Sequence, residues 1–250
     1  MRMFRRSFIA VGRAYPRLVN PVWSFAYPLL FRKNEYHAGE NYEGSRQEVF
    51  ERIYSENLWH SLESKSGDGS SLVQTKPVRA ALPRVLAQVN GTVIFDAPCG
   101  DFHWMQHVRF SPEIRYIGAD LVRPLIDKLQ NNFGNAQRSF EVRDIVEQPA
   151  LDCDLWLCRD VLFHLPMADI IRILTNIDPT KTRYLLTTTY PWVRENRDVK
   201  AGGFRFINLE MPPFSLPRPE LRIDDFIVPE PPRVLALWRA DLIAASIRKN

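Results

Sequence analysis

The segment from Val93 to Asp101 joins an apolar run to a turn that carries two acids. The apolar run ends at Asp96, and the turn that follows contains Gly100 and Asp101. Glycine lets the backbone approach a ligand closely, and a helix that begins after the turn would present backbone N–H groups at the same place. Because the two carboxylates would repel a pyrophosphate and attract an ammonium group, the turn favours a ligand that carries a positive charge.

Two further acids follow apolar runs of the sequence. Asp120 comes after Tyr116–Ala119, roughly 20 residues beyond Gly100, and an acid in that position can accept hydrogen bonds from both ribose hydroxyls. Asp144 follows Ser139–Val142 and could accept a hydrogen bond from an adenine amino group; the alternative is a solvated loop acid. The Asp120 spacing predicts a nucleoside without choosing its class, whereas the acidic turn favours S-adenosylmethionine over NAD.

Polar side chains also follow the apolar run Leu155–Cys158. Arg159 and Asp160 come first, and His164 lies in the apolar segment that comes next. Methyl transfer to a hydroxyl requires that a proton be removed, and histidine titrates near neutral pH, so Asp160 and His164 are the candidate catalytic bases. The alternative for His164 is a packing role beneath the site, because its neighbours are apolar.

A loop rich in serine and glycine, Ser66-Gly-Asp-Gly-Ser70, precedes these strands. With Tyr54 and Trp59, it is predicted to form a lid over the methionine end of the cofactor. Its glycines would permit closure, and the hydroxyls of Ser66, Ser70 and Thr75 could bind the cofactor carboxylate. Thr75 can also cap a helix with Pro77 in its first turn. The alternative for the loop is a solvated flexible segment.

Several aromatic and polar residues outside the predicted strands could line a binding site for the methyl acceptor. Aromatic surface from residues such as Trp192 and Phe204, combined with arginine and asparagine, fits a sugar or another small polar molecule. The alternative is ordinary packing of a loop. The residues predicted to bind the acceptor are His103, Asn196, Arg205 and Asn208.

From residue 92 onward, strand-like and helix-like segments alternate, which predicts an α/β fold with a parallel sheet and helices on both faces. The ligand should lie at the carboxyl ends of the strands. Helices are expected at about 48–60, 102–108, 122–132, 167–176 and 240–248. The strand-like runs are Thr92–Ala97, Tyr116–Ala119, Ser139–Val142, Leu155–Cys158, Tyr184–Thr189 and Val234–Trp238.

The chain is expected to form one domain with an N-terminal extension. Residues 1–47 are a basic and apolar extension with a polar linker, and residues 48–250 are the single domain. Within that domain we expect a helical lid at 48–90, the core at 91–190 and a strand and helix at 233–250. The intervening residues 191–232 are rich in proline, look irregular, and are expected to lie over the binding crevice.

Charge is concentrated in the extension. Residues 1–33 hold seven basic residues and no acid, although the 250-residue chain has a net charge of only +4. Because the basic excess is confined to this segment, we expect no nucleic-acid partner. The segment could be a transit peptide, could contact a membrane surface or a partner, or could pack on the domain itself. Prolines at 16, 21 and 28 are expected to break any long helix there.

The three cysteines, Cys99, Cys153 and Cys158, indicate neither a disulfide framework nor a zinc site, because they are few and lack CxxC spacing. Cys99 is expected to pack within the turn. A reducing compartment follows, so we expect the protein to be cytoplasmic or peripheral to a membrane. No run of 18 apolar residues predicts a spanning helix, and no clustered ligands predict a metal.

In this order and spacing the motifs resemble those of the class I S-adenosylmethionine-dependent methyltransferases. The turn matches the family's glycine-rich loop only partly, since Pro98 and Phe102 stand where glycines are usual. A narrower resemblance, to a bacterial branch of the family, rests on Phe95–Met105 (FDAPCGDFHWM) and Cys158–Leu165 (CRDVLFHL), together with the SGDGS loop.

The resemblance implies a Rossmann-like fold, with a mostly parallel seven-stranded sheet between helices and an N-terminal helical extension. It also implies S-adenosylmethionine as cofactor, with Asp120 as the ribose acid and Asp144 as the adenine acid. Besides the lid residues, the predicted cofactor contacts are Asp96, Ala97, Pro98, Gly100, Asp101, Trp104, Asp120, Leu121, Asp144, Ile145 and Arg159.

The favoured function is methyl transfer to an oxygen of a small polar or glycan-type acceptor, because the branch resembles enzymes of surface-sugar biosynthesis. One alternative is an NAD-dependent oxidoreductase, which the absence of a GxGxxG turn disfavours. Another is a non-catalytic, membrane-associated binding module on the same scaffold. The sequence leaves the oligomeric state open.

Overall fold

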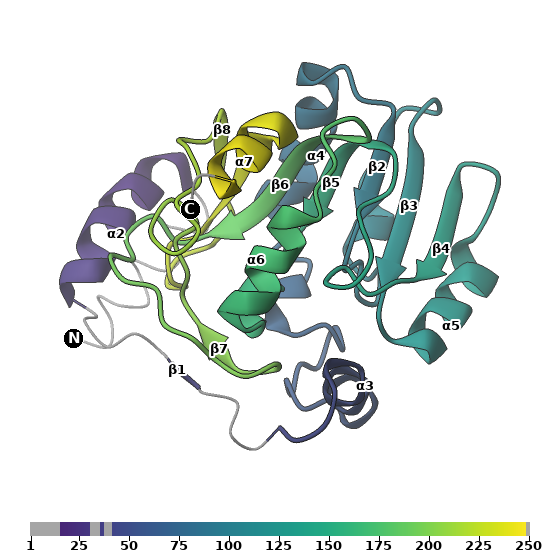
Figure 1. Cartoon of the computed structure of the whole chain (residues 1–250), viewed down its shortest axis with the longest axis horizontal. Coiled ribbons are helices and arrows are strands. Elements are labelled where there is room, and N and C mark those ends of the chain that lie inside the picture. The colour runs from purple at the N-terminus through teal and green to yellow at the C-terminus, as the bar shows by residue number, and fades with distance from the viewer. Residues whose placement is uncertain (1–15, 31–35, 38–41, 249–250) are drawn as a thin grey trace.

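The computed structural model describes residues 16–30, 36–37 and 42–248. Its centre is a seven-stranded sheet with the order β4-β3-β2-β5-β6-β9-β8 (Figure 1). Strands β2 to β6 pair in parallel, and β9 runs antiparallel to both of its neighbours. The strands are β2 (Val93–Asp96), β3 (Arg115–Asp120), β4 (Arg138–Val142), β5 (Cys153–Cys158), β6 (Thr182–Thr189), β8 (Leu221–Asp224) and β9 (Val234–Arg239).

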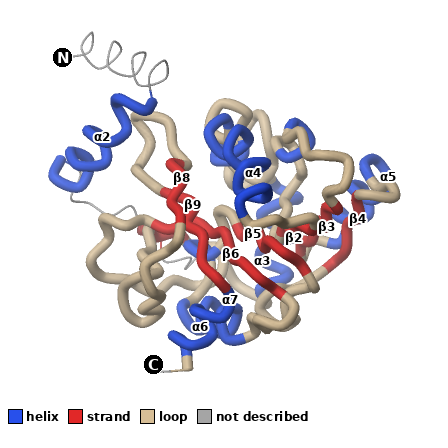
Figure 2. Tube along the Cα trace, turned by 90° about the horizontal axis from the view of Figure 1, so that it is seen from above, coloured by secondary structure: helices blue, strands red, loops and turns tan. Residues whose placement is uncertain are grey.

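Helices cover both faces of this sheet (Figure 2). Alternate residues of one strand enter opposite layers: Leu155 and Leu157 of β5 pack in the layer of α4 and α5, and Trp156 packs in the layer of α6 and α7. Burial on both faces explains why these strands are continuous apolar runs. The helices are α4 (Lys76–Gln88), α5 (Arg123–Phe133), α6 (Met167–Thr175) and α7 (Ala240–Ile247).

The predicted α/β fold with a mostly parallel seven-stranded sheet is confirmed. The helix expected at about 102–108 is wrong: only a short 3-10 helix forms, at Met105–His107. Phe102 has a φ of +59°, which ends any regular helix at that point. The proline-rich segment is also less irregular than expected, because it contributes β8 to the edge of the sheet and β7 (Phe204–Arg205), which pairs with β1 (Tyr36–His37).

The N-terminal extension contains a helix, α2 (Pro16–Leu30), which the prolines do not break. The described part of α2 begins at Pro16, and Pro21 and Pro28 lie inside it. One face of α2 packs on the segment after β8, where Val19 contacts Phe226 and Val228, and this packing offsets the cost of the two interior prolines. The basic residues Arg2, Arg5, Arg6, Arg13, Arg32 and Lys33 lie outside the described residues.

Helix α3 (Arg46–Glu56) begins at a capping box. Ser45 Oγ accepts a hydrogen bond from the Glu48 backbone N–H, and the Glu48 carboxylate accepts one from the Ser45 N–H. The helix lies beyond the carboxyl ends of β2 and β3 (Figure 1). Within the described ranges, no helix has the length and apolar character needed to cross a bilayer.

Candidate functional site

A cleft opens at the carboxyl ends of the parallel strands, beneath α3 and the loop that follows it. It contains about 1000 Å³ of empty space, open solvent included. Most of the predicted site residues line this cleft, although they come from five separate segments of the chain. Those residues are Tyr54, Trp59, Ser66, Ser70, Asp96, Pro98, Gly100, Trp104, Asp120, Leu121, Asp144, Ile145, Arg159, Asp160 and His164.

The turn after β2 is held by the strands on either side of it. The Ala97 N–H donates to the Leu157 carbonyl, and the Ala97 carbonyl accepts from the Trp156 ring. Ala97 therefore lies outside the cleft lining, contrary to its predicted place. Gly100 adopts a φ of +55°, which is unfavourable for residues with a Cβ. This conformation brings the Gly100 N–H to within 3.2 Å of Asp120 Oδ2.

Two acids of the turn region face the cleft and have no lysine or arginine within ion-pair distance among the described residues. Asp120 accepts hydrogen bonds from the Gly100 and Val122 N–H groups, and burial raises its pKa. Asp96 accepts one from the Tyr116 hydroxyl at 2.6 Å, and burial raises its pKa to about 7. These carboxylates suit a ligand that brings hydroxyl donors and a positive charge.

The third predicted acid, Asp101, is bound to the lid loop and lies outside the cleft lining. Its carboxylate accepts hydrogen bonds from the Ser64 hydroxyl at 2.8 Å and the Lys65 N–H at 2.9 Å. In return, Ser66 Oγ accepts a hydrogen bond from the Asp101 N–H at 2.8 Å. The serine loop is therefore bound to the turn after β2 by these three hydrogen bonds.

Thr75 lies farther from the cleft than predicted. It occupies the N-cap position of α4, but its hydroxyl donates to the Ser71 carbonyl and accepts from the Arg79 side chain, and it makes no capping hydrogen bond to the helix backbone. The side chain is completely buried. Thr75 therefore holds the base of the lid loop and does not line the cleft.

Arg46 in α3 forms ion pairs with acids on the opposite side of the cleft. From the first position of α3, its guanidinium lies 2.6 Å from Asp144 Oδ2 and 2.7 Å from Asp169 Oδ2. Asp144 Oδ1 also accepts a hydrogen bond from the Val146 N–H. The acid predicted to receive an adenine amino group is therefore an anchor for the lid as well, with one lone pair left on each oxygen.

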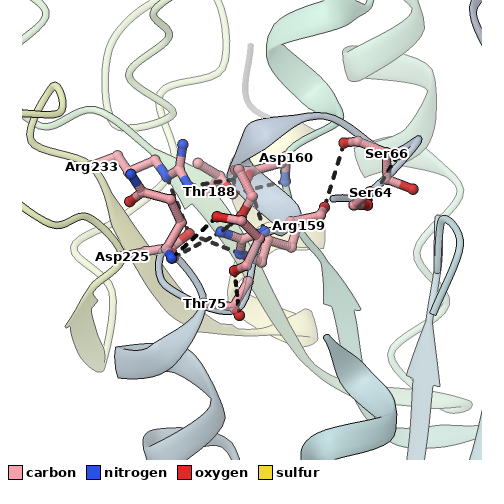
Figure 3. Close-up of polar contacts among 12 residues, drawn as sticks. Ser64, Ser66, Thr75, Arg159, Asp160, Thr188, Asp225 and Arg233 are labelled. Carbon is pink, nitrogen blue, oxygen red and sulfur yellow. Dashed lines mark hydrogen bonds and ion pairs between the residues drawn. The ribbon is translucent and has the colours of Figure 1, made fainter. Parts of the chain in front are cut away.

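Below the lid loop lies a buried cluster of two arginines and two aspartates (Figure 3). Arg159 makes a two-point contact with Asp225 at 3.0 Å, and also lies 3.0 Å from Asp160 and 2.9 Å from the Gly69 carbonyl. Arg233 contacts both aspartates, at 3.2 and 3.3 Å. The cluster therefore links the lid loop to the segment after β8.

Asp160 is ionised in this cluster. Burial alone would raise its pKa, but the adjacent Arg159 and Arg233 guanidinium groups lower it. Its Oδ1 also accepts a hydrogen bond from the Thr188 hydroxyl. Because two cations hold its charge, this arrangement favours a role in fixing Arg159 over a role in removing a proton.

His164 lines the cleft as a neutral imidazole. Its Nδ1 lies 2.7 Å from the Gly203 carbonyl oxygen, which can only accept, so Nδ1 carries the proton. The ring stacks on Trp59, with ring centroids 5.1 Å apart, and burial lowers its pKa to about 4. The lone pair of Nε2 is left to accept a hydrogen bond.

The four residues predicted to bind the acceptor all lie outside the cleft lining. Each is engaged elsewhere, and three of them bind backbone carbonyls in loops. His103 pairs with Glu63 at 2.9 Å. Asn196 donates to the Pro212 carbonyl, Asn208 to the Val193 carbonyl and Arg205 to the Leu162 carbonyl.

The segment 191–232 contributes no residue to the cleft lining, although it was expected to lie over the crevice. Residues between Arg46 and Ser70 line the cleft instead. Several lining residues were not predicted, and most are apolar side chains of α3 or of the strand ends. They are Arg46, Phe50, Ile53, Lys65, Cys99, Val122, Leu125, Arg143, Val146, Val161 and Leu165. The capping box at Ser45 and Glu48 signals where α3 begins, but no local pattern indicates that Arg46 contacts Asp144.

Within residues 16–30, 36–37 and 42–248, no group of three or more histidine, cysteine, aspartate or glutamate side chains is arranged to hold a metal. All three cysteines are buried and free of disulfide bonds.

The chain matches no family model, and it matches no curated protein. Its fold is similar to solved structures at low identity. The methyltransferase domain of the bacterial CtHen1 is 14% identical with a TM-score of 0.40, over 46% of this chain and 66% of that one. LaPhzM is 15% identical with a TM-score of 0.48, over 67% and 56%. The N-methyltransferase NodS from Bradyrhizobium japonicum WM9 is 14% identical with a TM-score of 0.47, over 66% and 96%. This chain thus spans less than two thirds of the length of the first two.

Proposed function

We propose that this chain is an S-adenosylmethionine-dependent methyltransferase whose cofactor binds in the cleft at the carboxyl ends of β2 to β5. The observation that carries the proposal is the pair of carboxylates that line the cleft beside the Gly100 turn, the buried Asp96 and the half-buried Asp120. Among the described residues, neither has a lysine or arginine within ion-pair distance. A ligand with a cationic group and a ribose satisfies both. A pyrophosphate would bring its charge against them, which disfavours NAD.

The residues present fit each part of such a cofactor. Asp120 would accept the ribose hydroxyls, and Asp144 with Leu121 and Ile145 would surround the adenine. Ser66, Ser70, Tyr54 and Trp59 would cover the methionine end. When bound, S-adenosylmethionine supplies an electrophilic methyl group on a sulfonium, so the protein needs chiefly to position the acceptor.

The proposed acceptor is a hydroxyl of a small polar or glycan-type molecule. His164 supports this class, because its Nε2 can accept a hydrogen bond from a hydroxyl while Nδ1 donates to the Gly203 carbonyl. A pKa of about 4 makes His164 a weak base. We therefore assign it the task of orienting the hydroxyl, whose proton passes to solvent as the new bond forms.

The proposed location is the cytoplasm. The support is that Cys99, Cys153 and Cys158 are all unpaired and buried, and unpaired cysteines are typical of a reducing compartment.

A direct test incubates the protein with a radiolabelled methyl donor and panels of sugars, nucleotide sugars, phenols, proteins and lipids. The proposal expects transfer to a hydroxyl of a small polar acceptor, and His164→Gln should lower kcat/KM by at least about tenfold. His107→Gln, on an exposed residue, is the matched control. Transfer only to protein or lipid would refute the acceptor class, and unchanged turnover in His164→Gln would refute the orienting role.

A further inference from the structure

One face of α2 is apolar and open to solvent. Leu18, Val22, Phe25 and Leu29 are 74%, 61%, 76% and 63% exposed, and we call these four residues the α2 stripe. Their spacing of three and four residues places them on one side of a helix. Leu30, beside the stripe, is exposed as well. Most of the exposed large apolar side chains of the described residues therefore belong to this one helix. A contiguous apolar patch of this kind marks a binding surface.

The opposite face of α2 is anchored to the domain, which fixes the outward direction of the stripe. Val19 and Tyr27 are buried. Asn20 donates a hydrogen bond to Asp224 at 2.9 Å, and the Trp23 ring donates one to the Glu230 carbonyl at 2.9 Å. Both views place the helix beside the β8 end of the sheet and away from α5 (Figures 1 and 2). The stripe cannot turn inward without breaking these contacts.

The sequence around the stripe is cationic. Residues 1–33 contain seven basic residues and no acid, and α2 itself carries a single charged residue, Arg17. An apolar helix face flanked by basic residues matches the interface of a bilayer with anionic headgroups. A nucleic acid would match the charge but leave the stripe uncovered. A second copy of this chain would cover the stripe but bring seven further positive charges against the first seven.

We propose that the α2 stripe binds this protein to the surface of an anionic lipid bilayer. The stripe enters the boundary between headgroups and acyl chains, and the net positive charge of the sequence 1–33 favours anionic headgroups. Because the face of α2 opposite the stripe is held against the domain by Val19, Asn20 and Trp23, the described helix would lie along the bilayer surface with only the stripe inserted. This inference is independent of the proposed methyl transfer.

The test is flotation of the full chain with vesicles of phosphatidylcholine alone, or of phosphatidylcholine with phosphatidylglycerol. We expect binding only to the vesicles with phosphatidylglycerol, and weaker binding as salt rises. The double variant Phe25→Ser with Leu29→Ser should bind at least about tenfold more weakly. The control, Leu62→Ser with Val73→Ser, removes exposed apolar side chains elsewhere and should bind like the unaltered protein.

A second variant tests the charge separately. Arg5→Glu with Arg6→Glu should weaken binding to the anionic vesicles even though the stripe is intact. Thermal melting of every variant, together with sedimentation of the unaltered chain and the stripe variant, completes the design. The proposal is overturned if the unaltered chain fails to float with anionic vesicles. It is also overturned if the control pair weakens binding as much as the stripe pair. A third contrary result would be that sedimentation shows the unaltered chain to be a dimer, that the stripe variant dissociates this dimer, and that the dimer does not bind lipid.

Discussion

Arg46 Nη2 lies 2.6 Å from Asp144 Oδ2, so the first residue of the lid helix is bound to the carboxylate that follows β4. The same guanidinium contacts Asp169 at the start of α6. Helix α3 supplies Phe50, Ile53 and Tyr54 to the cleft lining. Arg46 therefore links this wall of the cleft to the acids on the opposite side.

Replacing Arg46 with methionine should release that wall. The expected result is affinity for S-adenosylhomocysteine weakened by about tenfold, because the apolar side chains of α3 would no longer be held against the ligand. Arg222→Met is the matched control, since Arg222 forms a more exposed ion pair with Glu210, and both residues lie outside the cleft lining. Calorimetric titration of both variants measures the effect, and equal affinities would show that Arg46 does not hold the lid.

Gly100 should tolerate no side chain. A Cβ at this position would lie 2.4 Å from Ser66 Oγ, and its φ of +55° adds strain of about 1–2 kcal/mol. Gly100→Ala should therefore destabilise the protein and loosen the lid loop. A double-mutant cycle with Ser66→Gly separates the two causes. Gly100→Ala should cost less free energy of unfolding in the Ser66→Gly background than in the unaltered protein, and equal costs would exclude the collision.

Asp96 should make stability depend on pH near neutrality. Burial raises its folded pKa from 3.8 to about 7, so the folded state binds this proton more tightly than the unfolded state. Its contribution to stability is full below pH 3.8 and is lost as pH rises through 7. In Asp96→Asn the amide oxygen can still accept a hydrogen bond from Tyr116, but the variant should not lose this contribution to stability as the pH rises.

Denaturant unfolding at pH 5 and pH 8 measures the difference between the two proteins. Relative to Asp96→Asn, the unaltered protein should lose at least about 1 kcal/mol of stability between these values. A difference that does not change with pH would mean that the Asp96 carboxyl titrates at its ordinary value.

His164 should make stability depend on pH in the opposite sense, so that stability is lost as the pH falls. Burial lowers its folded pKa from 6.5 to about 4, so its contribution is present above pH 6.5 and is lost as pH falls through 4. Relative to His164→Gln, the unaltered protein should lose at least about 1 kcal/mol of stability between pH 7 and pH 4.5. Identical acid sensitivity in the two proteins would contradict a buried neutral imidazole, and His107→Gln again serves as the exposed control.

The strands could be predicted because a strand that is buried on both faces is a continuous run of apolar residues in the sequence. Leu155, Trp156 and Leu157 are apolar in succession because both faces of β5 are covered. The acids Asp96 and Asp120 could be placed at one sheet edge for the same reason, since the carboxyl ends of parallel strands meet there.

The contacts between loops could not be predicted, because they depend on which distant segments meet. Nothing near Arg159 in the sequence indicates Asp225, 66 positions away. Asn196 and Asn208 have the residue type of a ligand site, but each satisfies backbone carbonyls of a folded loop. Buried carbonyls require such donors, and an asparagine in a proline-rich segment looks the same in either role.

The most direct test of the central claim is calorimetric titration of the purified protein with S-adenosylhomocysteine and with NAD. We expect binding of S-adenosylhomocysteine that Asp120→Asn abolishes, no binding of NAD, and normal binding in Asp127→Asn, which changes an exposed acid of α5. Binding of NAD without S-adenosylhomocysteine, or affinity that Asp120→Asn leaves unchanged, would contradict the assignment of the cleft.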